Sequence, residues 1–182
     1  MKRLLTTFFA LISITVLSAQ NPIIITGRIE NCLNRNPSFL EKKWFNPETL
    51  IEETKTIDFS IGENGLFYLK IIPSNSLYNR YWIQLGNERT HLDLTTGDSI
   101  YMTLDATWFD ESIKYYGKGS GRNNYRRDVF LEFWDSNASD KLNYTNNSTQ
   151  FLNGLKMLSD RKVSLLNRYY LSGEIDSSYY RI

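Results

Sequence analysis

His91 and Asp93 are the residues whose spacing comes closest to that of a catalytic pair. They lie two positions apart in an alternating segment, residues 90–94, and such residues of a β-strand point to the same face. A histidine beside a carboxylate can act in acid–base catalysis or bind a metal ion. The sequence places no nucleophile or third ligand beside them. A solvent-facing polar pair is therefore the favoured interpretation, and a small hydrolase is a distant alternative.

The cysteine and histidine counts limit the available chemistry. Cys32 is the only cysteine and His91 the only histidine among 182 residues. These counts exclude a disulfide framework within the chain, a Cys/His zinc site and an internal dithiol. Cys32 follows an apolar segment and is expected to be a small buried hydrophobic residue, with a reactive thiol or an intermolecular disulfide as the alternative. We expect no catalytic residue, no metal site and no cofactor.

A glycine-rich segment, Gly117-Lys118-Gly119-Ser120-Gly121, invites comparison with phosphate-binding loops. It lacks the GxxxxGK[ST] pattern, and it follows a strand-rich region in place of a strand–helix–strand unit. We therefore expect a glycine hinge between strands and helices.

Four Asn-x-Ser/Thr sequons cluster in a polar segment between residues 136 and 149. Such sequons matter in a eukaryotic secretory pathway, and an Asn-rich loop also produces them by chance, which we favour. The sequons begin at Asn137, Asn143, Asn146 and Asn147.

The first 20 residues have the three-part pattern of a secretory signal peptide. Lys2 and Arg3 precede an apolar run over residues 4–17, and Ser18-Ala19-Gln20 supplies small residues for cleavage. The run is shorter than the roughly 20 apolar residues of a spanning helix. We expect export, cleavage after Ala19 or Gln20, and no membrane span afterwards.

Composition narrows the classes of partner. With 41% hydrophobic and 14% aromatic residues, the chain is typical of one globular domain with a core. Without Lys2 and Arg3 it has 19 basic residues against 20 acidic ones. Nucleic-acid binding requires concentrated positive charge, so we expect no nucleic-acid partner.

Period-two alternation with turn residues predicts about seven strands between Ile23 and about Tyr116. Their close, regular spacing is typical of an antiparallel sandwich or barrel. Asn64-Gly65 predicts a hairpin between its flanking strands. Residues 34–50 are predicted to form a long loop that Trp44 and Phe45 pin against the sheet. The predicted strands are residues 23–30, 56–61, 66–71, 81–85, 90–94, 100–104 and 112–116.

After residue 117 the apolar spacing becomes helical. It predicts a helix over residues 124–135, a polar break, and a second helix over residues 148–170. Ser172 is expected to cap a third helix that starts at Glu174. The predicted fold class is α+β: an antiparallel β-sandwich of about seven strands followed by two or three helices. The predicted domains are a signal peptide (1–20), a β-sandwich (21–117) and a helical segment (118–182).

Three segments together resemble the N-terminal β-rich accessory region of envelope thiol-disulfide oxidoreductases of the TlpA/ResA-like thioredoxin family. Thr96-Gly97-Asp98-Ser99-Ile100 matches a turn before a strand, and residues 117–125 match a GxGxxxNxY pattern that leads into helices. Ile25-Thr26-Gly27-Arg28-Ile29 looks like that region's first strand. The resemblance covers roughly residues 23–175. It implies export to the periplasm or outer envelope of a Gram-negative bacterium.

In that family the helices lead into a thioredoxin domain with a Trp-Cys-x-x-Cys active site. This chain has no CxxC motif and ends at Ile182, about where that domain would begin. Residues 118–182 are therefore interpreted as a truncated connector, and the family's dithiol exchange is not carried over. The resemblance also implies a candidate O-glycosylation signal at Asp98-Ser99-Ile100, although a turn residue starting a strand is favoured.

These observations predict a non-enzymatic exported accessory or interaction domain. An envelope protein or peptide is the expected partner, with strand addition at a sheet edge as the mode of contact. The alternative is a stand-alone carbohydrate- or peptide-binding module that uses exposed Tyr and Trp side chains, because the chain has 12 Tyr and 4 Trp residues.

Overall fold

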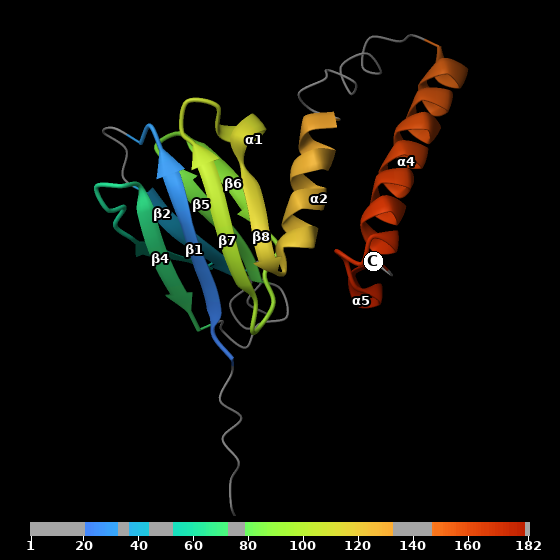
Figure 1. The fold of residues 1–182 in the computed structure, drawn as a ribbon. Coiled ribbons are helices and arrows are strands. Elements are labelled where there is room, and N and C mark those ends of the chain that lie inside the picture. The colour runs from blue at the N-terminus through green and yellow to red at the C-terminus, as the bar shows by residue number, and fades with distance from the viewer. Residues whose placement is uncertain (1–20, 33–36, 44–52, 73–78, 133–146, 181–182) are drawn as a thin grey trace, which may run out of the picture.

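The computed structural model describes residues 21–32, 37–43, 53–72, 79–132 and 147–180. Within these ranges, two four-stranded sheets pack face to face, and the helices lie beside one edge of the pair (Figure 1). The sheet orders are β4-β1-β7-β8 and β3-β2-β5-β6. The predicted α+β sandwich is therefore confirmed, with eight strands in place of about seven. The strands are β1 (Ile23–Glu30), β2 (Pro37–Lys43), β3 (Glu53–Asp58), β4 (Leu66–Ile71), β5 (Asn79–Leu85), β6 (Glu88–Leu92), β7 (Ser99–Asp105) and β8 (Lys114–Lys118).

The main core forms because alternate residues of each strand point between the sheets. In β1, Ile23, Ile25, Gly27 and Ile29 are buried, while the residues that alternate with them are at least partly accessible. Phe39 of β2 and Ile83 of β5 are fully buried on the opposite side of the same core. The core therefore lies on the face that alternate residues of each strand share.

The Asn64-Gly65 turn forms, but it does not join paired strands. Gly65 has a φ of +79°, and its N–H donates to the Gly62 carbonyl at 2.8 Å. β3 pairs with β2, whereas β4 pairs with β1 in the other sheet. The predicted hairpin is therefore wrong, because a turn signal marks where the chain reverses and not which sheet the next strand enters.

The pairing of β1 with β7 departs from the antiparallel pattern. These two strands pair in parallel and place Ile25 opposite Ile100 at the middle of their sheet. Both strands alternate buried and accessible residues, as antiparallel strands do. Alternation alone therefore does not distinguish the two directions.

Part of the predicted loop over residues 34–50 is the strand β2, so this prediction is wrong for Pro37–Lys43. β2 lies between β3 and β5, with Phe39 opposite Ile83. Pro37 occupies the first position of the strand, where a missing N–H is tolerated. Trp44 and Phe45 lie outside the described residues, as does the predicted signal peptide.

One helix agrees with its predicted bounds, two differ from theirs, and the short helix α1 was not predicted. They are α1 (Phe109–Ser112), α2 (Ser120–Phe130), α4 (Ser148–Leu171) and α5 (Ser177–Tyr180). The predicted helix over residues 148–170 is confirmed, and Asn147 caps it by accepting the N–H groups of Thr149 and Gln150. The helix predicted over residues 124–135 is α2, which begins at Ser120, directly after Gly119 at φ +91°, and ends at Phe130.

Ser172 does not cap the last helix, which corrects the prediction. It ends α4, and its hydroxyl donates to the Tyr169 carbonyl at 3.0 Å. Asp176 takes the capping role by accepting the N–H groups of Ser178 and Tyr179 at 2.9 and 3.0 Å. α5 accordingly begins at Ser177, three residues later than predicted.

A second, smaller core joins α2 to the C-terminal helices. Leu165, Tyr169 and Ile175 are buried in it, and Tyr125 and Val129 of α2 pack against them. The Tyr169 hydroxyl donates to Asp128 of α2 at 2.6 Å. Burial, followed by this hydrogen bond to Asp128, raises the pKa of Tyr169. α2 thus contacts the sandwich on one side and α4 on the other (Figure 1).

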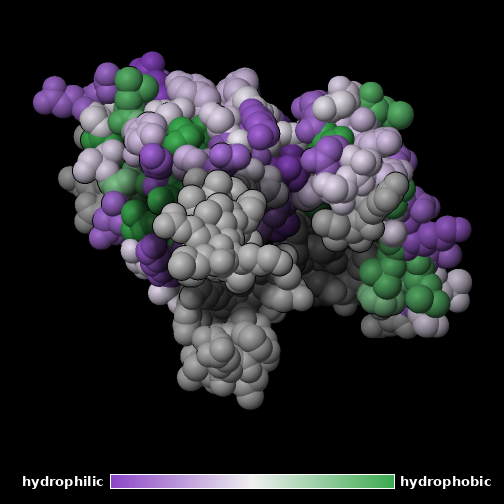
Figure 2. Space-filling model, turned by 90° about the horizontal axis from the view of Figure 1, so that it is seen from below, coloured by the Kyte–Doolittle hydropathy of each residue, from purple (hydrophilic) through white to green (hydrophobic). Residues whose placement is uncertain are grey.

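The helices that follow β8 expose several apolar side chains on their surface. Seen from below, this part carries hydrophobic green patches beside purple ones (Figure 2). Its exposed apolar residues include Leu152, Val163 and Leu171 of α4. No helix among the described residues has the length and hydropathy needed to span a membrane.

Candidate functional site

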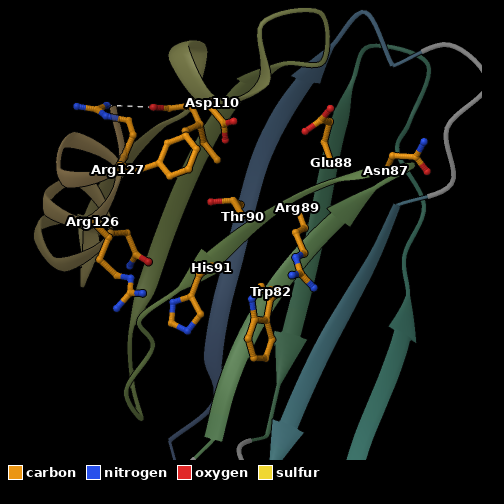
Figure 3. Close-up of a pocket in the computed structure, with 12 residues that line it drawn as sticks. Trp82, Asn87, Glu88, Arg89, Thr90, His91, Asp110, Arg126 and Arg127 are labelled. Carbon is orange, nitrogen blue, oxygen red and sulfur yellow. Dashed lines mark hydrogen bonds between the residues drawn. The ribbon is translucent and has the colours of Figure 1, made fainter. Parts of the chain in front are cut away.

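A cavity of about 400 Å³ lies where β5, β6 and their connecting turn meet α1, Ile113 and α2 (Figure 3). We call it the seam pocket because it follows the line where helices meet the sandwich. Trp82 and Phe130 supply apolar walls, and Arg89, His91 and Arg126 supply polar ones. The predicted residue His91 therefore lines a real cavity.

His91 is held neutral in this pocket. Its ring meets the edge of Trp82 at a centroid distance of 5.1 Å and an interplanar angle of 87°. Burial first, and then the positive charge of Arg126, lowers the pKa of His91 to about 4, although Asp93 opposes the shift. Its Nδ1 atom is buried and makes no hydrogen bond in the described structure.

Asp93 anchors helices to the sandwich. Its carboxylate accepts from Tyr179 at 2.8 Å and lies 3.3 Å from the Arg126 guanidinium. Its main chain pairs with the Asn123 side chain, which accepts the Asp93 N–H at 2.8 Å and donates to the Asp93 carbonyl at 3.1 Å. His91 Nδ1 is 3.9 Å from Asp93 Oδ1. The predicted pair is therefore adjacent in space, but Asp93 is engaged mainly with α2 and α5.

The lining of the seam pocket gives little support to hydrolysis. The hydroxyl nearest to His91 in the chain, that of Thr90, pairs with the Tyr115 hydroxyl at 3.1 Å on the core side of β6. Cys32 packs against the main core and does not line this pocket. The described residues contain no group of three or more potential metal ligands. The hydrolase alternative stays an untested prediction.

The neutral state of His91 makes stability depend on pH in a defined window. Between pH 4 and about 6.5 the unfolded chain binds a proton at His91 that the folded chain does not. The free energy of unfolding therefore rises with pH across this window, by at most about 3 kcal/mol from this residue. Urea unfolding at pH 4.5 and 7 should show a smaller difference for His91→Gln than for the wild type. Equal differences would contradict the assignment.

Asp98 forms a second polar centre, at the N-terminal end of α2. It is 2% exposed and accepts the Thr95 N–H at 2.7 Å and the Arg122 guanidinium. Gly119 passes so closely that a Cβ there would overlap the Asp98 carboxylate. The two motifs behind the family resemblance thus meet in space, and their contacts fasten α2 to the sandwich.

The glycines that were predicted to form a hinge have a packing role. A Cβ at Gly117 would overlap the Ser99 carbonyl, and one at Gly121 would overlap the Glu174 carbonyl. Gly117 and Gly119 also have positive φ angles of 89° and 91°. These positions therefore require glycine because backbones approach closely there.

A row of tyrosines crosses the outer face of the β4-β1-β7-β8 sheet. Strand register places Tyr68 opposite Thr26, Thr26 opposite Tyr101, and Tyr101 opposite Tyr116. The three tyrosines are 59%, 41% and 51% exposed, and the rings of Tyr101 and Tyr116 lie 6.3 Å apart with an interplanar angle of 44°. We call Tyr68, Tyr101 and Tyr116 the tyrosine row.

Basic residues border the tyrosine row on both sides. Two residues further along the strands, on the same face, Lys70 lies opposite Ile24 and Lys118 lies opposite Ser99. On the other side, Arg28 lies opposite Thr103, which lies opposite Lys114. All four basic side chains are exposed. The arrangement combines aromatic surface with positive charge on an open sheet face.

Comparisons with known proteins provide little further information. No family model matches the chain, and no curated protein matches it. A solved structure described as a putative cell adhesion protein from Bacteroides ovatus is similar, with a TM-score of 0.33 and 14% identity. The match covers 54% of this chain and 43% of that one. The resemblance to TlpA-like proteins stays a prediction.

Sequence reasoning identified His91, Asp93 and the two glycine-containing motifs, but it missed how they combine. Arg126 lies beside His91 and Asp93, a neighbour that the sequence analysis did not connect with them. The tyrosine row was missed because it depends on the register of four strands. Asn137, Asn143 and Asn146 lie outside the described residues. Ser99, the acceptor of the candidate O-glycosylation signal, is exposed at the start of β7.

Proposed function

We propose that the protein is a non-enzymatic exported binding domain that holds an extended glycan on its tyrosine row. The observation that carries this proposal is the alignment of three exposed tyrosines across four adjacent strands. This proposal combines two hypotheses drawn from the sequence: that the protein is an exported interaction domain, and that it binds carbohydrate through exposed aromatic side chains. Export rests on the N-terminal signal pattern.

The dimensions of the row suit a chain of sugar rings. Neighbouring strands lie about 4.8 Å apart, so Tyr68 and Tyr101, two strands apart, are separated by about 10 Å. One pyranose unit of an extended glycan has a length comparable to the distance between two neighbouring strands. The C–H-rich face of a sugar packs well on an aromatic ring, while the tyrosine hydroxyl stays hydrated.

The position of the tyrosine row favours a glycan over a peptide bound by strand addition. Peptides recognised by strand addition bond to the main chain of an edge strand and place alternate side chains in pockets. The tyrosine row runs across the strands, and its central member, Tyr101, belongs to β7, which is paired on both sides. Contacts on this face must therefore come from side chains.

Replacing Tyr101 with Ala is expected to weaken glycan binding about fivefold, because an aromatic contact contributes about 1 kcal/mol. The Tyr101→Ala/Tyr116→Ala double variant should bind at least tenfold more weakly. Binding is measured first on an array of neutral and acidic glycans and then by calorimetry with the bound oligosaccharide.

Tyr170→Ala is the matched control. Tyr170 is 39% exposed on α4, where its ring stacks on Tyr180 at 4.5 Å, far in sequence from the tyrosine row. This variant should bind as the wild type does. The proposal would be abandoned if no glycan on the array bound, or if both sites affected binding equally.

A further inference from the structure

The charges around the tyrosine row point to the chemical class of its ligand. We infer that the face binds an acidic, carboxylate-bearing glycan, such as a polymer of hexuronic acids; this inference rests on the proposed glycan-binding function. The tyrosines supply stacking that any sugar can use. The basic residues on both sides supply a preference that only a charged sugar can use.

The basic residues stand at a useful distance from the stacked sugars. Lys70 and Arg28 each lie two residues along their strand from the level of the row, and so do Lys114 and Lys118. Two residues of an antiparallel strand span about 7 Å. A uronate carboxylate projects from the edge of its ring, so a sugar centred on Tyr101 or Tyr116 directs its charge toward these side chains.

Three of the four cations form no ion pair within the described structure. Arg28 forms an exposed ion pair with Glu30 at 3.1 Å. No ion pair involves Lys70, Lys114 or Lys118 among the described residues, and all three are exposed. Glu30 and Asp105 lie opposite each other, two residues beyond Arg28 and Thr103 along their strands. The positive charge is therefore concentrated around the tyrosine row and ends at these two acidic residues.

A nucleic acid would also stack on aromatic residues beside cations, but the charges here favour a glycan. Single-stranded nucleic acids need a positive groove that follows a phosphate at every nucleotide. The face has four cations, one already paired with Glu30, in a chain whose basic and acidic residues nearly balance. An acidic peptide would use the cations but would leave the three aligned rings without a role.

The test compares ligands that differ only in charge. Hexamers of 1,4-linked galacturonate and of 1,4-linked mannuronate are titrated against the full chain at low salt, each beside its methyl ester. At least one acid should bind tenfold or more tightly than its ester. Raising the salt to 0.5 M should reduce that preference severalfold, because exposed charges are screened. Tyr101→Ala should weaken the acid and its ester alike.

A charge-removing variant separates this inference from the proposed function. Lys70→Gln/Lys118→Gln should weaken binding of the acid about tenfold and leave binding of the ester unchanged, whereas Lys156→Gln on α4 should change neither. Equal affinity for acid and ester would overturn the acidic-glycan inference while keeping the glycan-binding proposal. Binding of neither pair would overturn both. Tighter binding of a polyglutamate peptide or single-stranded DNA would overturn the inference in favour of that ligand.

Discussion

We expect the Asp98→Asn variant to have a free energy of unfolding about 3 kcal/mol lower than that of the wild-type protein. Asp98 is 2% exposed, and the side chain of its partner Arg122 is 11% exposed. Removing the carboxylate charge leaves the buried Arg122 guanidinium with Asp176 as its remaining carboxylate, which is 3.8 Å away and 59% exposed. The Arg122 Nε atom has no hydrogen-bond partner in the described structure, and an exposed carboxylate at this distance compensates only weakly. Urea unfolding at pH 7 measures the loss.

Glu30→Gln provides the control for Asp98→Asn. Glu30 also pairs with an arginine, Arg28, but both side chains are 53% exposed. An exposed pair contributes at most about 1 kcal/mol, so this variant should be close to the wild type. Arg122→Met and the Asp98→Asn/Arg122→Met double variant complete the cycle. If the loss of unfolding free energy in the double variant equalled the sum of the losses in the two single variants, the two residues would not act as a pair.

The Asp98–Arg122 contact shows where sequence reasoning succeeds and where it stops. The segments around both residues were singled out as motifs, and the turn before a strand was predicted at the correct position. Their meeting could not be predicted, because it depends on α2 returning to the start of β7, 24 residues earlier in the chain. A local pattern identifies such residues but does not identify the partner that each requires.

The same distinction applies to the strands. Alternation identified the buried face of β1, β4 and β7 because burial on one face imposes a period of two. It missed β2, whose Pro37 and lysines favour a loop but whose position between β3 and β5 stabilises a strand. It also assigned β3 and β4 to one hairpin. Tertiary packing decides both cases, and local propensity does not contain that information.

The candidate sites divide in the same way. His91 and Asp93 were predicted together because both lie in one alternating segment, and the structure places them 3.9 Å apart. The tyrosine row and its basic neighbours come from β1, β4, β7 and β8, so their alignment depends on the register of three strand pairs. The number of tyrosines suggested a stacking surface but could not locate it.

Gly121→Ala is expected to weaken the packing of α4 and α5 against α2. The free energy that stabilises this contact should fall by about 3 kcal/mol. A Cβ at Gly121 would overlap the backbone carbonyl of Glu174, so one of the two main chains must move. Ala favours a helix over Gly by about 1 kcal/mol, so any destabilisation must come from this overlap. Hydrogen exchange followed by mass spectrometry should show faster exchange in α4 and α5.

The pattern of exchange matters as much as its size. If the small core of Leu165, Tyr169 and Ile175 depends on close approach at Gly121, exchange should rise there and remain slow in β1 and β7. Gly62→Ala is the control, because a Cβ at Gly62 would lie 3.4 Å from the flexible Asn64 side chain. Faster exchange across both sheets would instead show that helices and sandwich unfold as one unit. Glycan binding by Gly121→Ala should persist in the first case, because the tyrosine row belongs entirely to the sandwich.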